Sequence, residues 1–287
     1  MRTTTTLTLG FLIVSLGAPS TPKPPSVQRV ADGVFAVLSL YHPSSRGRGV
    51  NAAFIGTSRT IVFIDSGMTV DSAEFIWNEA VKRFPGRSRS VLVLTHFHCD
   101  HTFGMGYFKA RGATAIGHRL IVPWLDPTQF AERLKRQTGK PMTFPEVMAL
   151  ESFENPDAGR RILGNVVLSS PDRVIEGDDV LEVDDLRLDL LHVPGHSPDS
   201  VCVFERRTGT LIAGDLVYNG GPPFLHDESK EAREQWIRSL LRVERLAILR
   251  IVPGHGPVCG ESAIADNIRS LRGSDDGARE AHRTPEP

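Results

Sequence analysis

Four residues of metal-binding type are crowded into one short segment of this sequence. His96, His98, Asp100 and His101 lie within six residues, directly after the apolar stretch at 91–94. Imidazole nitrogens and carboxylate oxygens are ligands that suit Zn²⁺ and related ions. The alternative is a polar loop of solvated histidines, but such a loop does not require so many histidines so close together. The pattern therefore predicts a metal site just past the C-terminal end of a strand, where α/β sheets place their sites.

Three later turns each carry one further residue of ligand type. His196, Asp215 and His255 each follow a short apolar stretch, and each comes directly after a glycine. A single histidine or aspartate at a turn is more often a cap or a solvated residue. Together with the first cluster, however, the three turns supply five histidines and two aspartates, which is enough for two metal ions. The joint pattern predicts one site built from several strand ends.

The elements that must position these residues form two similar halves. Each half is rich in short apolar strands and is followed by helices, which predicts a sheet-on-sheet sandwich with helices outside. The irregular helical stretch at 123–155 is the expected lid or substrate-side insertion. We expect strands within 27–40 and at 51–55, 60–64, 91–94, 113–117, 179–183, 186–193, 201–204, 210–213 and 246–252, and helices at 71–84 (capped by Asp71), 103–111, 230–245 and 263–271.

The order of these motifs resembles the metallo-β-lactamase superfamily of dinuclear metallohydrolases, over residues 27–271. The resemblance implies a four-layer αββα sandwich, of α+β or α/β class, with the site at one edge of the sheets. It also implies the ligand set with a bridging aspartate that glyoxalase II-like members have. By this resemblance His96, His98 and His196 bind one metal, Asp100, His101 and His255 bind the other, Asp215 bridges both, and Asp65 supports the metal loop from behind.

Such a site implies a hydrolase. Neutral imidazoles leave the charge of the metal uncancelled, so that a bound water has a pKa near ~7 instead of about 15.7. Two Zn²⁺ ions, with iron or manganese as alternatives, can share the resulting hydroxide and stabilise the oxyanion formed on attack. Asp100 is the expected catalytic residue because it is both a ligand and a hydrogen-bond acceptor that can orient the nucleophile. The expected reaction is hydrolysis of a polarised carbonyl or phosphoryl group in a small molecule.

The residues around the candidate ligands limit the substrate classes that we expect. Glyoxalase II places its last histidine in a Cys-Gly-His-Glu-Tyr setting, whereas His255 lies in Pro-Gly-His-Gly-Pro. Beta-lactamases of the superfamily usually lack the bridging aspartate, so Asp215 counts against efficient lactam cleavage. We therefore expect a small ester, lactone or thioester, with Tyr218 and His226 as candidate substrate contacts. The alternatives are a β-lactamase, a mono-iron persulfide dioxygenase and a non-catalytic metal-binding protein.

Composition and the two ends of the chain set the remaining expectations. The 287 residues have a net charge of −1, so no nucleic-acid partner is expected. Residues 1–18 resemble a secretory signal peptide and are too short to span a bilayer. This predicts a periplasmic or secreted protein, with the cytoplasm as the alternative, and no membrane insertion of the mature chain. We expect a linker at 19–26, one catalytic domain at 27–272 and a disordered tail at 273–287, and we leave the oligomeric state open.

Overall fold

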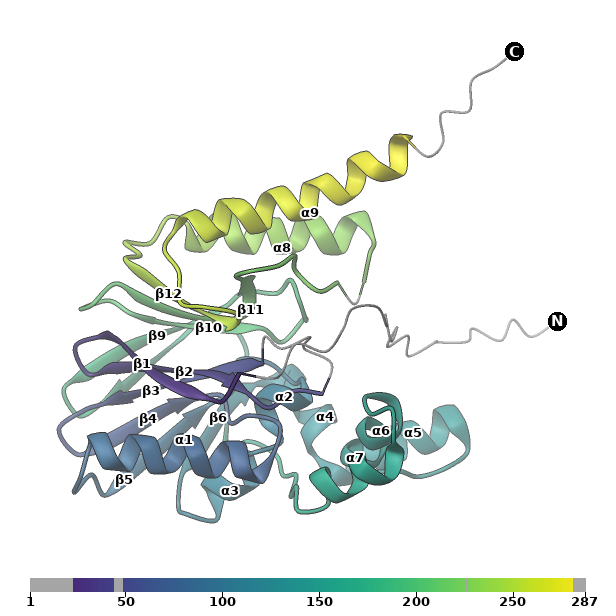
Figure 1. Ribbon diagram of the computed structural model, residues 1–287, viewed down its shortest axis with the longest axis horizontal. Coiled ribbons are helices and arrows are strands. Elements are labelled where there is room, and N and C mark those ends of the chain that lie inside the picture. Colours follow the sequence, from purple (N-terminus) through teal and green to yellow (C-terminus); the bar gives the residue numbers. More distant parts are fainter. Residues whose placement is uncertain (1–22, 44–48, 226, 281–287) are drawn as a thin grey trace.

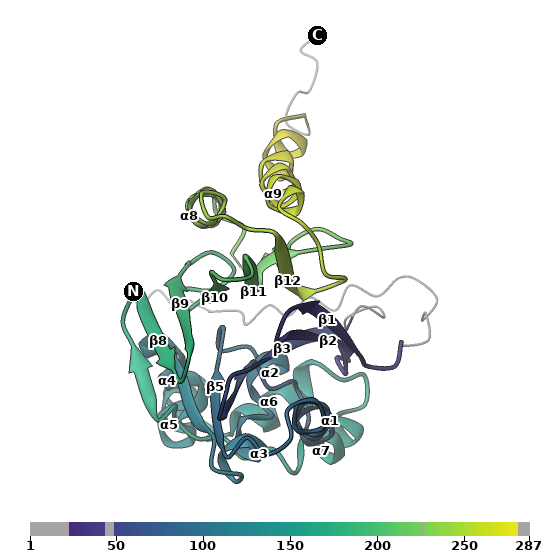
Figure 2. The same cartoon turned by 90° about the vertical axis from the view of Figure 1, so that its left-hand side faces the viewer.

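Two β-sheets pack face to face, and helices cover the outer surface of each (Figure 1). The structure, a computed structural model, describes residues 23–43, 49–225 and 227–280. Figure 2, turned by 90°, shows the layers edge-on, with α1 below one sheet and α8 and α9 above the other. The predicted αββα sandwich is confirmed.

The first sheet contains seven strands in the described part of the chain, in the order β1 to β7. Neighbouring strands from β1 to β4 are antiparallel, and those from β4 to β7 are parallel. The parallel strands end at the same edge of the sheet, and the metal-ligand segment begins just after β5. The strands are β1 (Ser26–Ala31), β2 (Val34–Leu40), β3 (Val50–Gly56), β4 (Thr60–Ile64), β5 (Arg89–Val93), β6 (Thr114–His118) and β7 (Arg173–Ile175).

The second sheet has five strands among the described residues, in the order β12-β11-β10-β9-β8. Its pairs are antiparallel except β11 and β12, which are parallel. Of the three later ligand-type residues, His196 lies in the loop after β9, Asp215 lies within β11 and His255 is the last residue of β12. The strands are β8 (Asp179–Val183), β9 (Leu186–His192), β10 (Val201–Glu205), β11 (Thr210–Tyr218) and β12 (Arg250–His255).

Apolar side chains from both sheets form the central core. Val62 and Val93 from the first sheet join Leu188, Val203 and Ile212 from the second in one buried cluster. Strands such as β4 and β11 are buried along their whole length, because a helix layer covers the face that the other sheet does not. Sheets that are covered on both faces have nearly continuous apolar strands. This explains why their sequences lack the usual alternation.

The outer helices pack through their apolar stripes. On α1 (Val70–Arg83), Ala73, Ile76 and Ala80 are buried against the first sheet, a spacing that puts them on one face of the helix. The helix α3 (Met105–Lys109) packs beside it, and α8 (Lys230–Val243) and α9 (Ser262–Glu280) cover the second sheet.

An all-helical insertion lies between β6 and β7 at one end of the sandwich (Figure 1). Its aromatic side chains, among them Phe130 and Phe144, form a separate cluster that packs against Phe103 and Met68 of the main body. The insertion occupies the place predicted for a lid, beside the short helix α2 that carries metal-type residues. Its elements are η1 (Arg119–Ile121), α4 (Val122–Leu125), α5 (Pro127–Thr138), α6 (Phe144–Glu151) and α7 (Pro156–Leu163), and α2 is Cys99–Thr102.

Four predicted boundaries were wrong. The strand predicted at 210–213 runs on to Tyr218, so that Asp215 lies within it and not in a turn after it. Thr69, not Asp71, caps α1, because the Thr69 side chain accepts a hydrogen bond from the backbone N–H of Ser72. The strand predicted at 246–252 begins only at Arg250, since residue Leu246 still donates to Val243 and continues the turn of α8. Finally, α9 runs on to residue 280, beyond the predicted end at 271, and takes in the start of the segment predicted to be disordered.

Some predictions concern residues outside the described part. These are the signal peptide at 1–18, the first half of the linker (19–22), residue His226, and the last residues of the tail, 281–287. Among the described helices, none is both long enough and apolar enough to cross a membrane.

Candidate metal centre

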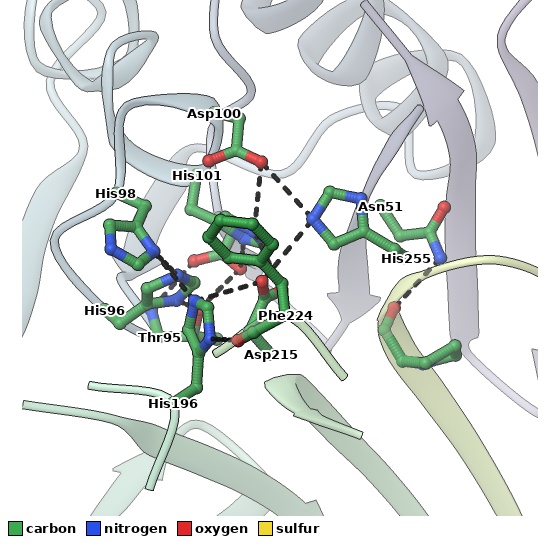
Figure 3. Close-up of polar contacts among 12 residues, drawn as sticks. Asn51, Thr95, His96, His98, Asp100, His101, His196, Asp215, Phe224 and His255 are labelled. Carbon is green, nitrogen blue, oxygen red and sulfur yellow. Dashed lines mark hydrogen bonds and ion pairs between the residues drawn. The ribbon is translucent and has the colours of Figure 1, made fainter. Parts of the chain in front are cut away.

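All seven predicted ligand residues come together at one edge of the sandwich (Figure 3). They arrive from four places: the segment after β5 that leads into α2, the loop after β9, strand β11 and the end of β12. Their donor atoms form two groups, and within each group the atoms lie within 4.8 Å of one another. The groups are His96, His98, His196 and Asp215, and Asp100, His101 and His255.

Three imidazole nitrogens converge in the first group. Nε2 of His96 lies 2.9 Å from Nδ1 of His98, and Nε2 of His196 lies 2.8 Å from the same atom. All three rings are buried. One ring nitrogen can share a proton with only one neighbour at a time, so these contacts cannot all be satisfied as hydrogen bonds between neutral histidines.

Asp215 lies between the two groups. Its Oδ2 is 3.3 Å from Nε2 of His196 and 3.5 Å from Nε2 of His255, and its Oδ1 is 3.1 Å from Nε2 of His101. Asp100 completes the second group, with Oδ2 3.3 Å from His255 Nε2 and 3.6 Å from His101 Nε2. One carboxylate thus touches histidines of both groups, as the bridging position predicted for Asp215 requires.

Backbone carbonyls fix the orientation of two of the rings. Nδ1 of His196 donates to the carbonyl of Phe224 at 3.1 Å, and Nδ1 of His255 donates to the carbonyl of Gly49 at 2.7 Å. A carbonyl can only accept, so in both rings the proton sits on Nδ1. Nε2 is then the ring atom that faces the site in both histidines, which is the usual arrangement behind metal-binding histidines.

Asp65 fixes two more rings from behind the site. Its Oδ2 accepts from Nδ1 of His101 at 2.7 Å and from Oγ1 of Thr95 at 2.8 Å, and its Oδ1 accepts from the backbone N–H of Thr95. The Thr95 hydroxyl, having donated to Asp65, accepts from Nδ1 of His96 at 3.0 Å. Asp65 itself has a φ of 64°, a left-handed conformation that aspartate tolerates better than most residues and that is frequent at functional sites.

The donor set fits divalent metal ions. Nε2 of His101 and Oδ1 of Asp215 are buried without a hydrogen-bond partner of normal geometry, although such atoms are rarely left unsatisfied in folded proteins. Four rings turn a nitrogen toward a small space that also holds two carboxylates. Nitrogen and carboxylate ligands of this kind suit zinc and also iron or manganese, and they do not by themselves identify the metal.

The surrounding histidines keep both carboxylates ionised. Burial alone raises the pKa of Asp100, but the charge interaction with His101 and the hydrogen bond to His255 outweigh burial and hold it well below its usual range. Burial likewise raises the pKa of Asp215, but the charge interactions with His255 and His101 outweigh burial and hold it well below its usual range. Both side chains are therefore in the form that binds a cation.

Two glycines allow strands to approach this closely. A Cβ on Gly254 would lie 1.8 Å from Oδ1 of Asp215, and a Cβ on Gly214 would lie 2.7 Å from the side chain of Thr95. Gly214 also has a φ of 50°, which glycine adopts at little cost. The lack of a side chain at both positions therefore lets Thr95 and Asp215 lie this close to the neighbouring strand.

A comparison with protein families decides the membership of the chain. Residues 45–255 match the family model described as the metallo-beta-lactamase superfamily. The chain belongs to this superfamily.

Relatives within the metallo-beta-lactamase superfamily include thioesterases. The chain is 26% identical over 242 residues to acyl-coenzyme A thioesterase MBLAC2 of Homo sapiens, covering 79% of each protein. It is 23% identical over 249 residues to an atrochrysone carboxyl ACP thioesterase of Aspergillus fumigatus, covering 84% of this chain and 61% of that one. A metallo-beta-lactamase from Pontibacter korlensis has a similar structure, with a TM-score of 0.64 and 18% identity over 87% of this chain and 99% of that one. At this identity the structural likeness concerns the fold.

Two residues of the site were not predicted from the sequence. Nε2 of His42 lies 3.5 Å from Oδ2 of Asp100, and its ring meets that of His255 edge-on at 5.8 Å. Asn51, in β3, donates to the carbonyls of Pro253 at 2.9 Å and Gly256 at 2.7 Å, and so holds the turn around His255 (Figure 3). A polar residue at a buried strand position was the signal for Asn51. His42 had none beyond its residue type.

Tyr218 lies behind the candidate ligands of this superfamily site. Its hydroxyl donates to Oδ2 of Asp215, and its ring stacks on that of His255, with centroids 5.4 Å apart and planes 13° apart. Tyr218 is buried, so in this structure it supports two ligand residues. Its predicted contact with substrate stays a prediction, as does that of His226, which lies outside the described residues.

A cavity of about 480 Å³ adjoins the first group of ligands. His98 and His196 form part of its wall, and most of the remaining lining is apolar. The lining comes from four parts of the described chain, namely 97–98, 120–124, 194–199 and 225–236. The cavity is therefore continuous with the metal centre and is bounded on one side by the insertion and on the other by the start of α8.

Proposed function

We propose that this member of the superfamily is a dinuclear metal-dependent hydrolase that cleaves acyl thioesters, with zinc as the expected metal. The position of Asp215, in contact with histidines of both ligand groups, is the observation that carries the dinuclear part of the proposal. Bound divalent ions supply Lewis acidity and a nucleophile at neutral pH. Thioesters are chosen from the expected ester, lactone and thioester because two relatives are named thioesterases.

The chain's own residues then have separate tasks. The five imidazoles bind the ions without cancelling their charge, and Asp65 together with the two backbone carbonyls holds four of these rings in place. Asp100 presents Oδ2 beside His255 and His42, where an ionised carboxylate could accept a hydrogen bond from the attacking water and orient it. The apolar cavity beside His98 and His196 excludes bulk water from one side of the reacting group.

The test is a substrate panel combined with metal analysis of the purified protein. We expect two zinc ions per chain, and faster hydrolysis of acyl thioesters than of aryl esters, lactones or β-lactams. Preferential cleavage of a β-lactam would support the β-lactamase alternative instead. A single iron ion per chain, with oxygen uptake on a persulfide substrate, would support the dioxygenase alternative. Stoichiometric metal without turnover of any of these substrates would support the non-catalytic metal-binding alternative. The predicted export of the chain is a separate proposal, which fractionation of cells that express it tests.

A further inference from the structure

The cavity beside the metal centre has a rigid aromatic wall. The ring of Trp124 stacks on that of Phe97 with centroids 4.0 Å apart and planes 13° apart, and the guanidinium of Arg133 lies 3.9 Å from the Trp124 centroid. Across the cavity, Trp236 is fixed by a hydrogen bond of 2.9 Å from its Nε1 to the carbonyl of Leu216. Because these rings are held by other contacts, the cavity exists before a ligand enters, and such preorganisation lowers the cost of binding.

The lining fits an apolar chain and not an anionic group. Leu120 and Trp124 on one side and Leu225 on the other present apolar surface, and Leu120 is 43% exposed. Apart from His98 and His196, no described lining residue is basic, whereas Asp199 and Asp227 are acidic. Arginine and lysine, which recognise phosphate groups, are therefore absent from the described lining. A helix N-terminus can also bind phosphate, but at the start of α8 the N–H of Ala232 already donates to the Ser229 side chain.

We propose that this cavity binds the acyl chain of the substrate, an unbranched apolar chain of several methylene groups. The wall formed by His98 and His196 places the carbonyl end of the chain at the metal centre, and the methylene groups lie along Leu120, Trp124 and Leu225. The thiol part of the substrate then leaves on the other side. The identity of the reacting end rests on the proposed function, but the affinity of the cavity for an apolar chain does not.

Two measurements keep these parts separate. The first is the binding of 1-decanol, a neutral probe, which is monitored by the change in tryptophan fluorescence. Trp124 and Trp236 line the cavity, while Trp77, the third tryptophan, stacks on Phe63 in the core. We expect saturable binding that weakens at least tenfold in Ala232→Phe, which fills the cavity from α8, and in Leu120→Ser. The matched control is Leu150→Ser, because Leu150 is equally exposed at 43% and is absent from the lining.

The second measurement is kcat/KM for thioesters of one thiol with acyl chains from two to fourteen carbons. Each methylene that enters the cavity should raise kcat/KM by about fourfold until the chain fills it. In Ala232→Phe the rise should end at a shorter chain. Saturable decanol binding without thioester hydrolysis would overturn the proposed function and leave the cavity assignment standing. Hydrolysis that is independent of chain length, with decanol binding equal in all three variants, would overturn the cavity assignment alone.

Discussion

The carboxylate of Asp65 lies 2.7 Å from Nδ1 of His101, and both side chains are buried. The same carboxylate accepts two hydrogen bonds from Thr95, so it ties the end of β5 to the helix that carries His101. Asp65 is thus the residue on which the orientation of this part of the site depends, although it touches the site only through other side chains.

Asp65→Asn should weaken metal binding by about 10- to 100-fold, since partners behind metal ligands typically contribute this much. An amide has only one oxygen that accepts. The variant therefore loses either the bond from the Thr95 N–H at Oδ1 or both bonds at Oδ2, from His101 and the Thr95 hydroxyl. Competition with a chromogenic chelator measures the change. Asp71→Asn, the same substitution at an exposed position on α1, is the control and should bind metal as the wild type does. Equal affinities in both variants would contradict the assignment.

Asp100→Asn should reduce turnover by about 100-fold or more, because the amide is a weaker metal ligand and no longer orients the attacking water with an ionised oxygen. The substitution keeps the shape of the side chain but removes the ionised oxygen beside His255 and His42. Steady-state kinetics on a thioester measure the effect, and circular dichroism checks that the fold persists. Unchanged turnover would show that Asp100 has another role.

Asp199 should make stability fall as the pH rises. Burial raises the pKa of this carboxyl to about 6, against weaker opposing interactions from Ser197 and the backbone of Phe97. The unfolded value is about 3.9, so the folded state is penalised once the pH exceeds that value, and fully above 6. Two pKa units correspond to about 3 kcal/mol.

Denaturant unfolding of Asp199→Asn, on chelator-treated protein, tests this. The variant should be more stable than the wild type by up to about 3 kcal/mol at pH 8, with the difference shrinking toward pH 4. A difference that does not change with pH would show that the carboxyl is not destabilised by burial.

Asp184 should have the opposite pH dependence. It accepts hydrogen bonds from the Thr57 side chain and the Arg59 backbone, which lower its pKa to about 2. The ionised form thus stabilises the folded protein above the unfolded pKa of about 3.9, and this contribution is lost as the pH falls through 2. Asp184→Asn, which tolerates the φ of 52° at this position, should melt at a lower temperature than the wild type at pH 7. The melting temperatures of the two proteins should converge as the pH falls from about 4 to 2, and a difference that does not change with pH would rule the explanation out.

The candidate ligands could be predicted because their residue types are rare and their order along the chain is specific. Their orientation could not, since the groups that fix His196 and His255 are the backbone carbonyls of Phe224 and Gly49. Any residue has a carbonyl, so the sequence carries no signal for these contacts.

Other features depend on which segments meet in three dimensions. Thr69 and Asp71 are both good capping residues, and only the path of the chain after β4 decides between them. The cavity is assembled from four distant segments, and its two tryptophans, Trp124 and Trp236, lie more than a hundred positions apart. Periodicity predicts that such side chains are apolar and does not predict that they face each other.

The most direct test of the dinuclear site is a metal titration of the chelator-treated protein. Zinc is added back in steps, while bound metal and thioester hydrolysis are measured on the same samples. The site geometry predicts no hydrolysis without metal and a rise that ends when two ions per chain are bound, with Asp215→Asn failing to retain the second ion. Hydrolysis that persists in metal-free protein, or that is complete with one ion in both proteins, would contradict it.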